Sequence, residues 1–448
     1  MHTTIPHVTQ SASQFVIRLM VQVSAAILVL MPFHAFLTVW AASFVGQYVA
    51  LRLWKEGLLV LLVLGLCYLI IYEPKIRRLL AHDLLVRLVC LYIAVLIIAG
   101  VIGLLVSTVT ARAFAQGLLL DSRFLVFFVV VWVVTQYDDV IARAWKRLLL
   151  LPAAVVVGLA TLQYSLLPID FLRHFGYGPD TIPAVSTIDQ KDAYQRVQST
   201  LRGANPLGAY LVIILSALGA IIIKVKRLGY RWALFFILSS LALVFTFSRS
   251  AWLGVLASMA WLVWTVATSP RARKILLIAG AVATIVFAAT LYMLRDNDRF
   301  QNVFFHTDEK SQSSESSNYG RLNALQDGVA DLVTEPWGGG TGTAGPASAY
   351  NDADDSSARI AENYYLQIGQ EVGVVGLGLF VAINVVVVRR LWQRRQSMLP
   401  QVLLASFVGI FVVNLVSHGW TDDTLAYVWW GLAGAAIAPR VKNSETSV

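Results

Sequence analysis

Long apolar runs alternate with short polar connectors along most of this chain, and this alternation dominates its hydrophobic pattern. A helix of about 20 apolar residues spans the ~30 Å hydrocarbon core of a bilayer, and it bonds its backbone polar groups internally. The pattern therefore predicts an all-α polytopic membrane protein with about 12 transmembrane helices. The expected spans are 18–45, 56–72, 84–106, 118–136, 148–167, 206–223, 232–247, 251–268, 275–294, 363–388, 401–417 and 425–438.

The polar connectors fall into two classes, because lysine and arginine gather in every second one. The basic connectors are 73–78, 143–147, 224–231, 270–274, 389–395 and 439–442. Cytoplasmic loops of membrane proteins carry such an excess of Lys and Arg, so we expect these connectors and both termini on the cytoplasmic side. Two long connectors, 168–205 and 295–362, then lie on the outer side. The sequence thus predicts a single transmembrane domain over 1–448 with two large outer loops.

The overall composition agrees with lipid as the main solvent of the chain. Hydrophobic residues make up 57% of it and charged residues only 14%, whereas soluble domains have ~25% charged residues. The net charge of +9 is explained by the basic connectors, so it does not predict a nucleic-acid partner. Cys67 and Cys90 lie inside apolar runs, where we expect reduced packing residues.

Patterns that would indicate a metal or a nucleotide are incomplete. His418, Asp422 and Asp423 (with His306) show no metal-ligand spacing, and the glycine-rich stretch 338–342 lacks the Gly-Lys-Ser/Thr of a phosphate loop. We therefore predict no metal and no cofactor, and we expect the glycine-rich stretch to be a mobile turn.

Arginines mark the outer ends of several expected spans. They are Arg123, Arg202, Arg249 and Arg321. A guanidinium group binds phosphate oxygens through two parallel hydrogen bonds, so a convergent set at the membrane surface would suit a lipid diphosphate. Alternatively, each arginine is an interfacial anchor or pairs with a carboxylate, Asp121 being the candidate for Arg123. Arg249 lies between two apolar spans, where an uncompensated charge is costly, so we expect it to have an anionic partner.

Glu362 ends the long outer loop where an apolar span begins. One hypothesis makes it a general base beside the arginines. The other makes it an acid that caps the following helix, since a carboxylate is favoured at a helix N-terminus. Asn363, Tyr365 and Gln367 follow at the membrane interface as candidate acceptor-side residues. Glu371 lies deeper, and we expect it to be a structural partner within the helix bundle.

Four segments together resemble the O-antigen ligase and O-antigen polymerase superfamily of bacterial inner-membrane glycosyltransferases. They are LRGANPLGAYL (201–211), FTFSRSAWLG (245–254), the Arg321 segment followed by EPWGGGTG (335–342), and ENYYLQIGQEVGVVGL (362–377). No segment is specific alone, but their order, spacing and common outer face make the combination specific. The resemblance covers most of the chain after about residue 110.

This resemblance implies transfer of a glycan from undecaprenyl diphosphate to a sugar hydroxyl at the periplasmic face of the inner membrane. Carried over by position, Arg202, Arg249 and Arg321, with Arg123 nearby, would bind the diphosphate, and the catalytic position falls on Glu362 in the long periplasmic loop. The expected enzyme is inverting and independent of metals. Its expected partners are the lipid-linked oligosaccharide donor, a glycan or lipid A core acceptor and membrane lipid, and a chain-length regulator stays open.

The acceptor is the point at which this chain departs from the pattern. Typical ligases that resemble it have His followed by Asn where this chain has Glu362-Asn363. Acidic versions look more like polymerases, which favours polymerisation of O-antigen or exopolysaccharide repeat units over ligation to lipid A core. A transporter or flippase of a lipid-linked or anionic substrate is a second alternative, and an envelope scaffold a third. A transporter would place its polar groups near the bilayer midplane, whereas the candidates here gather at one face.

Overall fold

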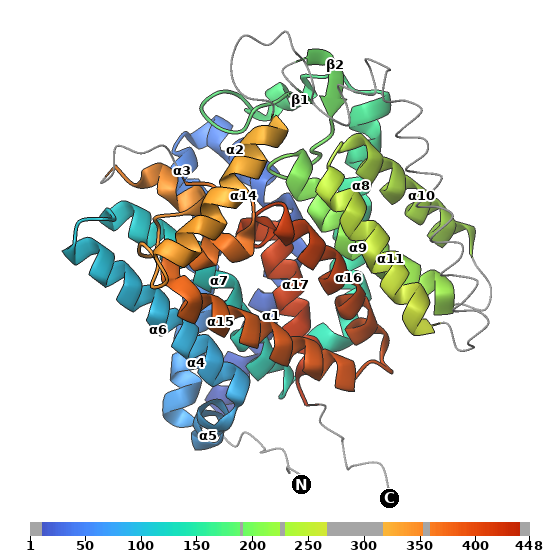
Figure 1. The fold of residues 1–448 in the computed structure, drawn as a ribbon. Coiled ribbons are helices and arrows are strands. Elements are labelled where there is room, and N and C mark those ends of the chain that lie inside the picture. The colour runs from blue at the N-terminus through green and yellow to red at the C-terminus, as the bar shows by residue number, and fades with distance from the viewer. Residues whose placement is uncertain (1–10, 189–190, 225–228, 267–316, 353–358, 440–448) are drawn as a thin grey trace, which may run out of the picture.

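The computed structural model describes residues 11–188, 191–224, 229–266, 317–352 and 359–439, which form a helical bundle (Figure 1). Its helices are α1 (Ser11–Leu30), α2 (His34–Val45), α3 (Tyr48–Leu51), α4 (Trp54–Tyr72), α5 (Pro74–His82), α6 (Leu84–Leu105), α7 (Ala111–Thr135), α8 (Val140–Ser165), α9 (Ala204–Lys224), α10 (Tyr230–Phe245), α11 (Arg249–Val266), α14 (Ser317–Thr334), α15 (Tyr364–Gln393), α16 (Met398–Leu415) and α17 (Asp423–Ile437). Short 3₁₀ helices cover Met31–Phe33, Phe171–Phe175, Gly345–Tyr350 and Gly419–Thr421.

Eight helical stretches among the described residues are long and apolar enough to cross a membrane. They are Ser11–Val45, Tyr48–Tyr72, Leu84–Leu105, Ala111–Thr135, Val140–Ser165, Ala204–Lys224, Tyr364–Gln393 and Met398–Leu415. Each coincides with an expected span. The expected spans 232–247, 251–268 and 425–438 are helices (α10, α11 and α17) but are not among the eight, and 275–294 lies outside the described residues. The all-α membrane fold is thus confirmed with eight candidate spans among the described residues, and the total of 12 stays a prediction.

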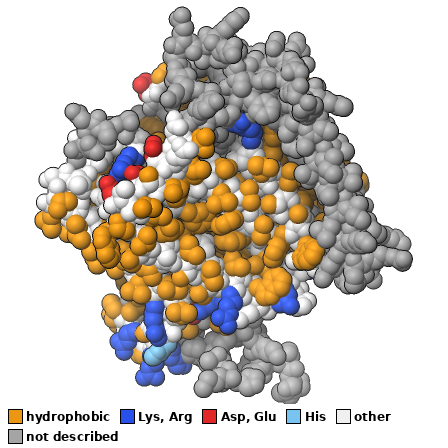
Figure 2. All heavy atoms as spheres, viewed as in Figure 1, with side chains coloured by type: hydrophobic (Ala, Val, Ile, Leu, Met, Phe, Trp, Pro, Cys, Tyr) orange, Lys and Arg blue, Asp and Glu red, His pale blue; other side chains and the backbone are white. Residues whose placement is uncertain are grey.

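The surface and the core of the bundle are apolar for different reasons. Figure 2 shows a broad hydrophobic belt with basic side chains along its lower edge, as expected for a surface in contact with lipid. Cys67 and Cys90 are exposed in α4 and α6, so the expectation that they are packing residues is wrong. The centre is formed by α7, α9 and α17, where Gly434 packs so closely on the backbone of Phe128 that a Cβ would lie 2.6 Å from its carbonyl oxygen.

Two of the expected basic connectors, 73–78 and 389–395, meet at one end of the bundle, whereas 270–274 lies outside the described residues. Arg390, near the end of α15, pairs with Asp83 between α5 and α6 at 2.9 Å, and Arg394 donates to the carbonyl oxygen of Ala436 in the last turn of α17. The short amphipathic helix α5 lies at this end, opposite the strands β1 (Ser186–Ile188) and β2 (Lys191–Arg196) (Figure 1). This antiparallel pair is the one addition to the predicted all-α fold among the described residues.

The first span is broken at Pro32, because proline cannot donate a helical hydrogen bond. Two carbonyl oxygens at the break accept hydrogen bonds from side chains of other segments. Thr424 donates to the carbonyl oxygen of Met31 at 3.0 Å and Thr200 to that of Pro32 at 2.7 Å. The break thereby ties the start of α2 to the segments that precede α9 and begin α17.

The glycine-rich stretch is buried inside the bundle, so the expectation of a mobile turn is wrong. Residues 340–345 are buried between α6, α7 and α15. The N–H groups of Gly339 and Gly340 donate to the carbonyl oxygens of Gln370 and Glu371 at 2.8 and 2.9 Å. α15 is interrupted immediately afterwards at Gly373, whose φ is +64°. Irregular backbone at membrane depth is tolerated where it is buried in protein. Here the glycine-rich stretch and the interrupted part of α15 are hydrogen-bonded to each other.

Candidate functional site

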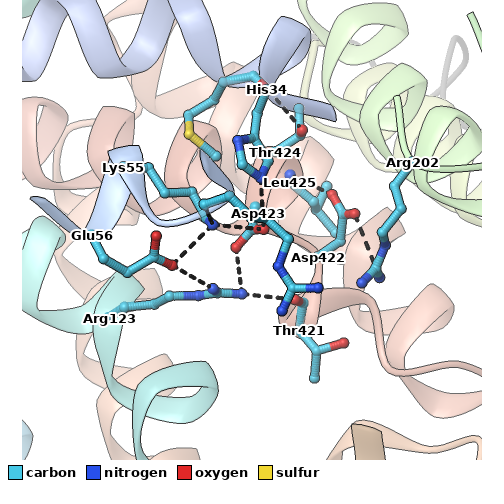
Figure 3. A network of polar contacts seen from close by, with 12 residues as sticks. His34, Lys55, Glu56, Arg123, Arg202, Thr421, Asp422, Asp423, Thr424 and Leu425 are labelled. Atoms are coloured by element: carbon cyan, nitrogen blue, oxygen red, sulfur yellow. Dashed lines mark hydrogen bonds and ion pairs between the residues drawn. The ribbon is translucent and has the colours of Figure 1, made fainter. Parts of the chain in front are cut away.

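A polar cavity lies where the break in the first span meets the starts of α4 and α17 and the middle of α7 (Figure 3). Its volume is about 70 Å³, enough for several water molecules or a small charged group. The polar side chains that line it are His34, Thr38, Tyr48, Arg52, Lys55, Glu56, Gln116, Arg123, Arg202, Asp422, Asp423 and Thr424. They come from segments far apart in the sequence.

Helix starts supply most of the charged groups of the cavity. Lys55 and Glu56 lie in the first turn of α4, and Asp423 begins α17. Asp422 is the N-cap of α17 and accepts a hydrogen bond from the N–H of Leu425 at 3.1 Å. Carboxylates are stabilised at this end of a helix because unbonded N–H groups point toward them.

A buried network of ion pairs forms the floor of the cavity. The guanidinium group of Arg123 contacts Glu56 at 3.2 Å, pairs with Asp423, and donates to the carbonyl oxygen of Thr421 at 3.1 Å. Lys55 lies 2.9 Å from Glu56 and 3.5 Å from Asp423 (Figure 3). The side chains of Lys55 and Arg123 are 2% and 5% exposed, so these two cations are almost closed to solvent. The suggested pairing of Arg123 with Asp121 is wrong.

Arg202 and Arg52 are the more accessible cations of the cavity. The side chain of Arg202 is 54% exposed, and its nearest carboxylate oxygen, on Asp422, is 3.9 Å away, beyond hydrogen-bond length. Arg52 is half-buried beside Tyr48. Together with Lys55 and Arg123, these arginines make four cations against three carboxylates. The cavity therefore carries a net positive charge.

The two neighbouring aspartates differ in their ionisation. Burial raises the pKa of Asp422, and the charge of Arg202 only partly opposes it. Burial acts in the same direction on Asp423, but Arg123 and Lys55 outweigh it and hold the pKa of that carboxyl far below its usual range. Asp423 is therefore the permanent counter-ion of the floor, and Asp422 the weaker anion at the rim.

His34 completes the cavity wall on the side of the broken first span. Its Nε2 lies 3.6 Å from Oδ2 of Asp423, and its ring packs against Trp54 with centroids 5.5 Å apart. The side chain is buried. Sequence reasoning had no ground for singling out His34, because a histidine on an apolar span has no partner within its own segment.

Two of the four predicted arginines line this cavity, Arg123 and Arg202. Arg249 begins α11 and is half-buried after the turn at Ser248, which packs on Gly208 in α9. It is not among the lining residues, although it shares its end of the bundle with Arg202. Arg321 belongs to α14, and its side chain lies outside the part that the structure describes.

Glu362 is half-buried immediately before α15 and adopts a left-handed backbone conformation with φ of +50°. Such a conformation costs a residue other than glycine ~1–2 kcal/mol, and strain of this kind concentrates at functional sites. The cap of α15 is Asn363, whose Oδ1 accepts from the N–H groups of Tyr365 and Leu366 at 2.9 and 3.1 Å. The helix-capping role considered for Glu362 therefore belongs to its neighbour.

The segment around Glu362 is joined to the turn that leads into the cavity. Asn363 donates to the carbonyl oxygen of Leu415 at 3.0 Å, and the N–H of Tyr364 donates to the carbonyl oxygen of Ser417 at 3.3 Å. That turn continues through Thr421, whose carbonyl oxygen accepts from Arg123. Glu362 and the cavity thus lie at the same end of the bundle, although Glu362 does not line the cavity.

The remaining candidates are packed within the protein. Tyr365 stacks among aromatic rings, with its centroid 5.4 Å from that of Phe411. Gln367 is buried beneath Gly345, where an added Cβ would overlap its amide. Glu371 is fully buried, and its place within the bundle agrees with the structural role expected for it.

Residues 234–381 match the family model described as O-antigen ligase. The chain carries an O-antigen ligase domain. This domain is that of membrane glycosyltransferases of the O-antigen ligase or polymerase type, so the resemblance in the sequence is confirmed. No curated protein matches the chain.

The O-antigen ligase domain contains Arg249, Arg321 and Glu362. The charged residues of the cavity all lie outside it, in the turn between α3 and α4, in α4 and α7, in the segment before α9 and at the start of α17. Sequence reasoning missed Arg52, Lys55 and Glu56 because they read as the polar border of an apolar span. The adjacent pair Asp422-Asp423 was the available signal, since two acids at the mouth of a span need cationic partners.

Proposed function

We propose that this protein is a glycosyltransferase that moves a glycan from undecaprenyl diphosphate to a sugar hydroxyl at the periplasmic face of the bacterial inner membrane. The observation that carries this proposal is the net positive cavity at the same end of the bundle as Glu362. The O-antigen ligase domain supplies the reaction class.

The diphosphate is bound at the mouth of the cavity by Arg202 and Arg52. These two are the cations that the buried ion pairs leave accessible, and a planar guanidinium matches phosphate oxygens in two places. Arg249 and Arg321 of the O-antigen ligase domain are assigned to the same clamp because of the resemblance of their segments to the superfamily. Arg123 supports the clamp from below, because its two terminal nitrogens already contact Glu56, Asp423 and Thr421.

Glu362 acts as the general base of the transfer. It removes the proton of the acceptor hydroxyl, and the resulting oxygen attacks the anomeric carbon of the donor from the side opposite the diphosphate. The bond between that carbon and the diphosphate oxygen breaks, its electron pair leaves with the diphosphate, and the configuration is inverted. Fixed cations stabilise the charge that develops on the leaving group, so the proposal needs neither a metal nor a cofactor.

The orientation in the membrane follows from the distribution of basic side chains. Lys75, Arg77 and Arg78 of α5, with the connectors around Arg390 and Arg394, lie at the end opposite the strands β1 and β2 (Figures 1 and 2). The positive-inside rule assigns that end to the cytoplasm. The cavity and Glu362 then face the periplasm.

The acceptor is the second point of the proposal. An acid at position 362 favours polymerisation, in which the acceptor is the sugar of another lipid-linked repeat unit, over ligation to lipid A core. A transporter is disfavoured because Arg202 and Arg52, the cations left accessible in the cavity, lie at helix ends, whereas transporters bind their substrates near the middle of their helices.

The test is reconstitution of the purified protein in vesicles with a defined undecaprenyl-diphosphate-linked oligosaccharide. A ladder of longer lipid-linked glycans with donor alone is the expected result. Transfer only when lipid A core is added would identify a ligase. Movement of the donor across the bilayer without new glycosidic bonds would overturn the proposal in favour of a transporter. Absence of both glycan transfer and donor movement would overturn it in favour of a scaffold.

A further inference from the structure

A second polar cluster lies inside the bundle, and the transfer reaction described above does not use it. It consists of Asp121 in α7 with Tyr364 and Glu371 in α15, all three fully buried. The hydroxyl of Tyr364 donates to Oδ1 of Asp121 at 3.0 Å. Glu371 lies beside Asp121 and faces the backbone N–H groups of Gly342 and Ala344.

This cluster connects the two parts of the proposed site. Asp121 precedes Arg123 by two residues on α7, and Tyr364 follows Glu362 by two residues at the start of α15. The hydrogen bond between them therefore joins the helix that bears the floor of the cavity to the helix that begins after the proposed base. In an apolar interior such a hydrogen bond is strong. A buried carboxyl oxygen that loses its hydrogen-bond donor costs the folded protein much free energy.

Close backbone packing also holds α7, the glycine-rich stretch and α15 together. A Cβ on Gly117 of α7 would lie 2.7 Å from the backbone nitrogen of Gly342, so the glycine-rich stretch touches α7 directly. The same stretch is bonded to α15 through Gly339 and Gly340. Small residues permit this approach between membrane helices, and α7, the glycine-rich stretch and the first half of α15 form one packed unit.

We propose that the Tyr364–Asp121 hydrogen bond is a positioning contact that sets the place of Glu362 relative to the cationic cavity. The inference rests on the proposed function. Asp121 acts here as a hydrogen-bond acceptor, so its charge is not required, whereas the hydroxyl of Tyr364 is. Loss of the contact shifts the base and leaves the diphosphate clamp intact, which lowers kcat without weakening donor binding.

The kinetic test uses the full-length protein in vesicles with a saturable lipid-linked donor. For Tyr364→Phe we expect kcat to fall by roughly 10- to 100-fold, the effect of a displaced catalytic group, with an unchanged KM for the donor. Asp121→Ala should behave in the same way. Asp121→Asn keeps an acceptor oxygen and should restore most of kcat.

Tyr92→Phe is the matched control. Tyr92 in α6 is a fully buried tyrosine near the cluster, and its hydroxyl has no hydrogen-bond partner among the described residues. Tyr92→Phe removes one hydroxyl group, as Tyr364→Phe does, but it should leave kcat unchanged. Equal losses in Tyr92→Phe and Tyr364→Phe would overturn the proposal, since general packing would then explain both. An Asp121→Asn variant as inactive as Asp121→Ala would also overturn it, because the charge would then be what matters.

A distance measurement keeps the inference separate from the reaction itself. Spin labels at the exposed positions Leu53 and Ile360, with Cys67 and Cys90 replaced by serine, report the separation of the two parts by pulsed electron resonance. One narrow distribution is expected in the parent and in Asp121→Asn, and a broadened or displaced one in Tyr364→Phe. An unchanged distribution in Tyr364→Phe would overturn the positioning contact, whereas lack of glycan transfer by the parent protein would overturn only the proposed function.

Discussion

The two parts of the proposed site are built from different kinds of interaction. Around the cavity, charged side chains from four separate segments pair with one another, and the floor is held by Arg123, Lys55, Glu56 and Asp423. Around Glu362, backbone hydrogen bonds, positive φ angles and close glycine contacts predominate. Charge thus prepares one part to bind an anion, and backbone geometry fixes the place of a single reacting group in the other.

This difference separates binding from catalysis in a way that substitutions can test. Changes at the cavity should act on donor affinity or on folding stability. Changes near Glu362 should act on turnover. A substitution that affects both quantities equally would argue that the two parts are one site in direct contact.

The largest effect is expected for Glu362→Gln, which removes the proposed base while keeping the size of the side chain. General base catalysis contributes typically ~10²–10⁴-fold, so turnover should fall by that factor with donor binding unchanged. Glycan product formed per minute in vesicles is the measurement. Glu335→Gln is the control, because Glu335 is exposed and pairs only loosely with Arg359 at 3.7 Å. Normal turnover in Glu362→Gln would remove this residue from the chemistry.

The same contrast explains how far the sequence could predict the molecule. The apolar length of a span is a local property set by bilayer thickness, so eight of the expected spans were located correctly. The helices α10 and α17 are 16 and 15 residues long, and the burial of α17 against its neighbours could not be read from its own hydropathy.

The site was predictable only where one segment carries the signal. Glu362 and Arg249 stand out within their own motifs. The partners of Arg123 are Glu56, 67 residues earlier, and Asp423 and Thr421 near the other end of the chain. Nothing in the spacing of these residues relates them, since only the packing of α4, α7 and α17 brings them together. The burial of the glycine-rich stretch was missed for the same reason, because its partners are backbone groups of other elements.

Loss of the shared counter-ion should have the next largest effect, this time on stability. Asp423→Ala leaves Arg123 and Lys55 buried with Glu56 as their remaining partner, and breaking a buried ion pair costs ~3–5 kcal/mol. The free energy of unfolding in detergent should fall by about this amount. Asp139→Ala is the comparison, since it breaks an exposed pair with Arg143 that is worth at most ~1 kcal/mol. Equal stability of the two variants would show that the floor of the cavity is not a structural network.

Arg202→Ala should weaken donor binding and spare stability. Charge-assisted hydrogen bonds contribute ~1.5–3 kcal/mol, so KM for the donor should rise by roughly 10- to 100-fold. Arg202→Lys should recover only part of this, because an ammonium group cannot bind in two places at once. The control is Arg143→Ala at the opposite end of the bundle, where the side chain is 69% exposed. An unchanged KM in Arg202→Ala would contradict the assignment of the cavity to the diphosphate.

Gly342→Ala tests the backbone side of the comparison. Gly342 has a φ of +96°, and its missing Cβ would overlap the carbonyl oxygen of Ala113, so we expect a loss of ~1–3 kcal/mol of stability. Gly378→Ala is the control, because nothing lies within 4 Å of the added Cβ and alanine favours the helix by ~1 kcal/mol. A thermal unfolding series should therefore move the two variants in opposite directions, and parallel shifts would contradict the close packing of α7 on the glycine-rich stretch.

The smallest effect is expected for Asp422→Asn, and its direction is the informative part. Asparagine preserves the cap of α17, since its side-chain oxygen can still accept from the N–H of Leu425. It removes the anion that competes with the donor for Arg202. Because the Arg202 side chain is 54% exposed, this pairing is worth only ~0.2–1 kcal/mol, and KM for the donor should fall by at most about 5-fold. Because the pKa of Asp422 is raised in the folded protein, the parent loses stability as pH rises through that pKa, and the variant should lack this loss. A higher KM in Asp422→Asn would mean that the carboxylate orients Arg202 for binding and does not compete with the donor.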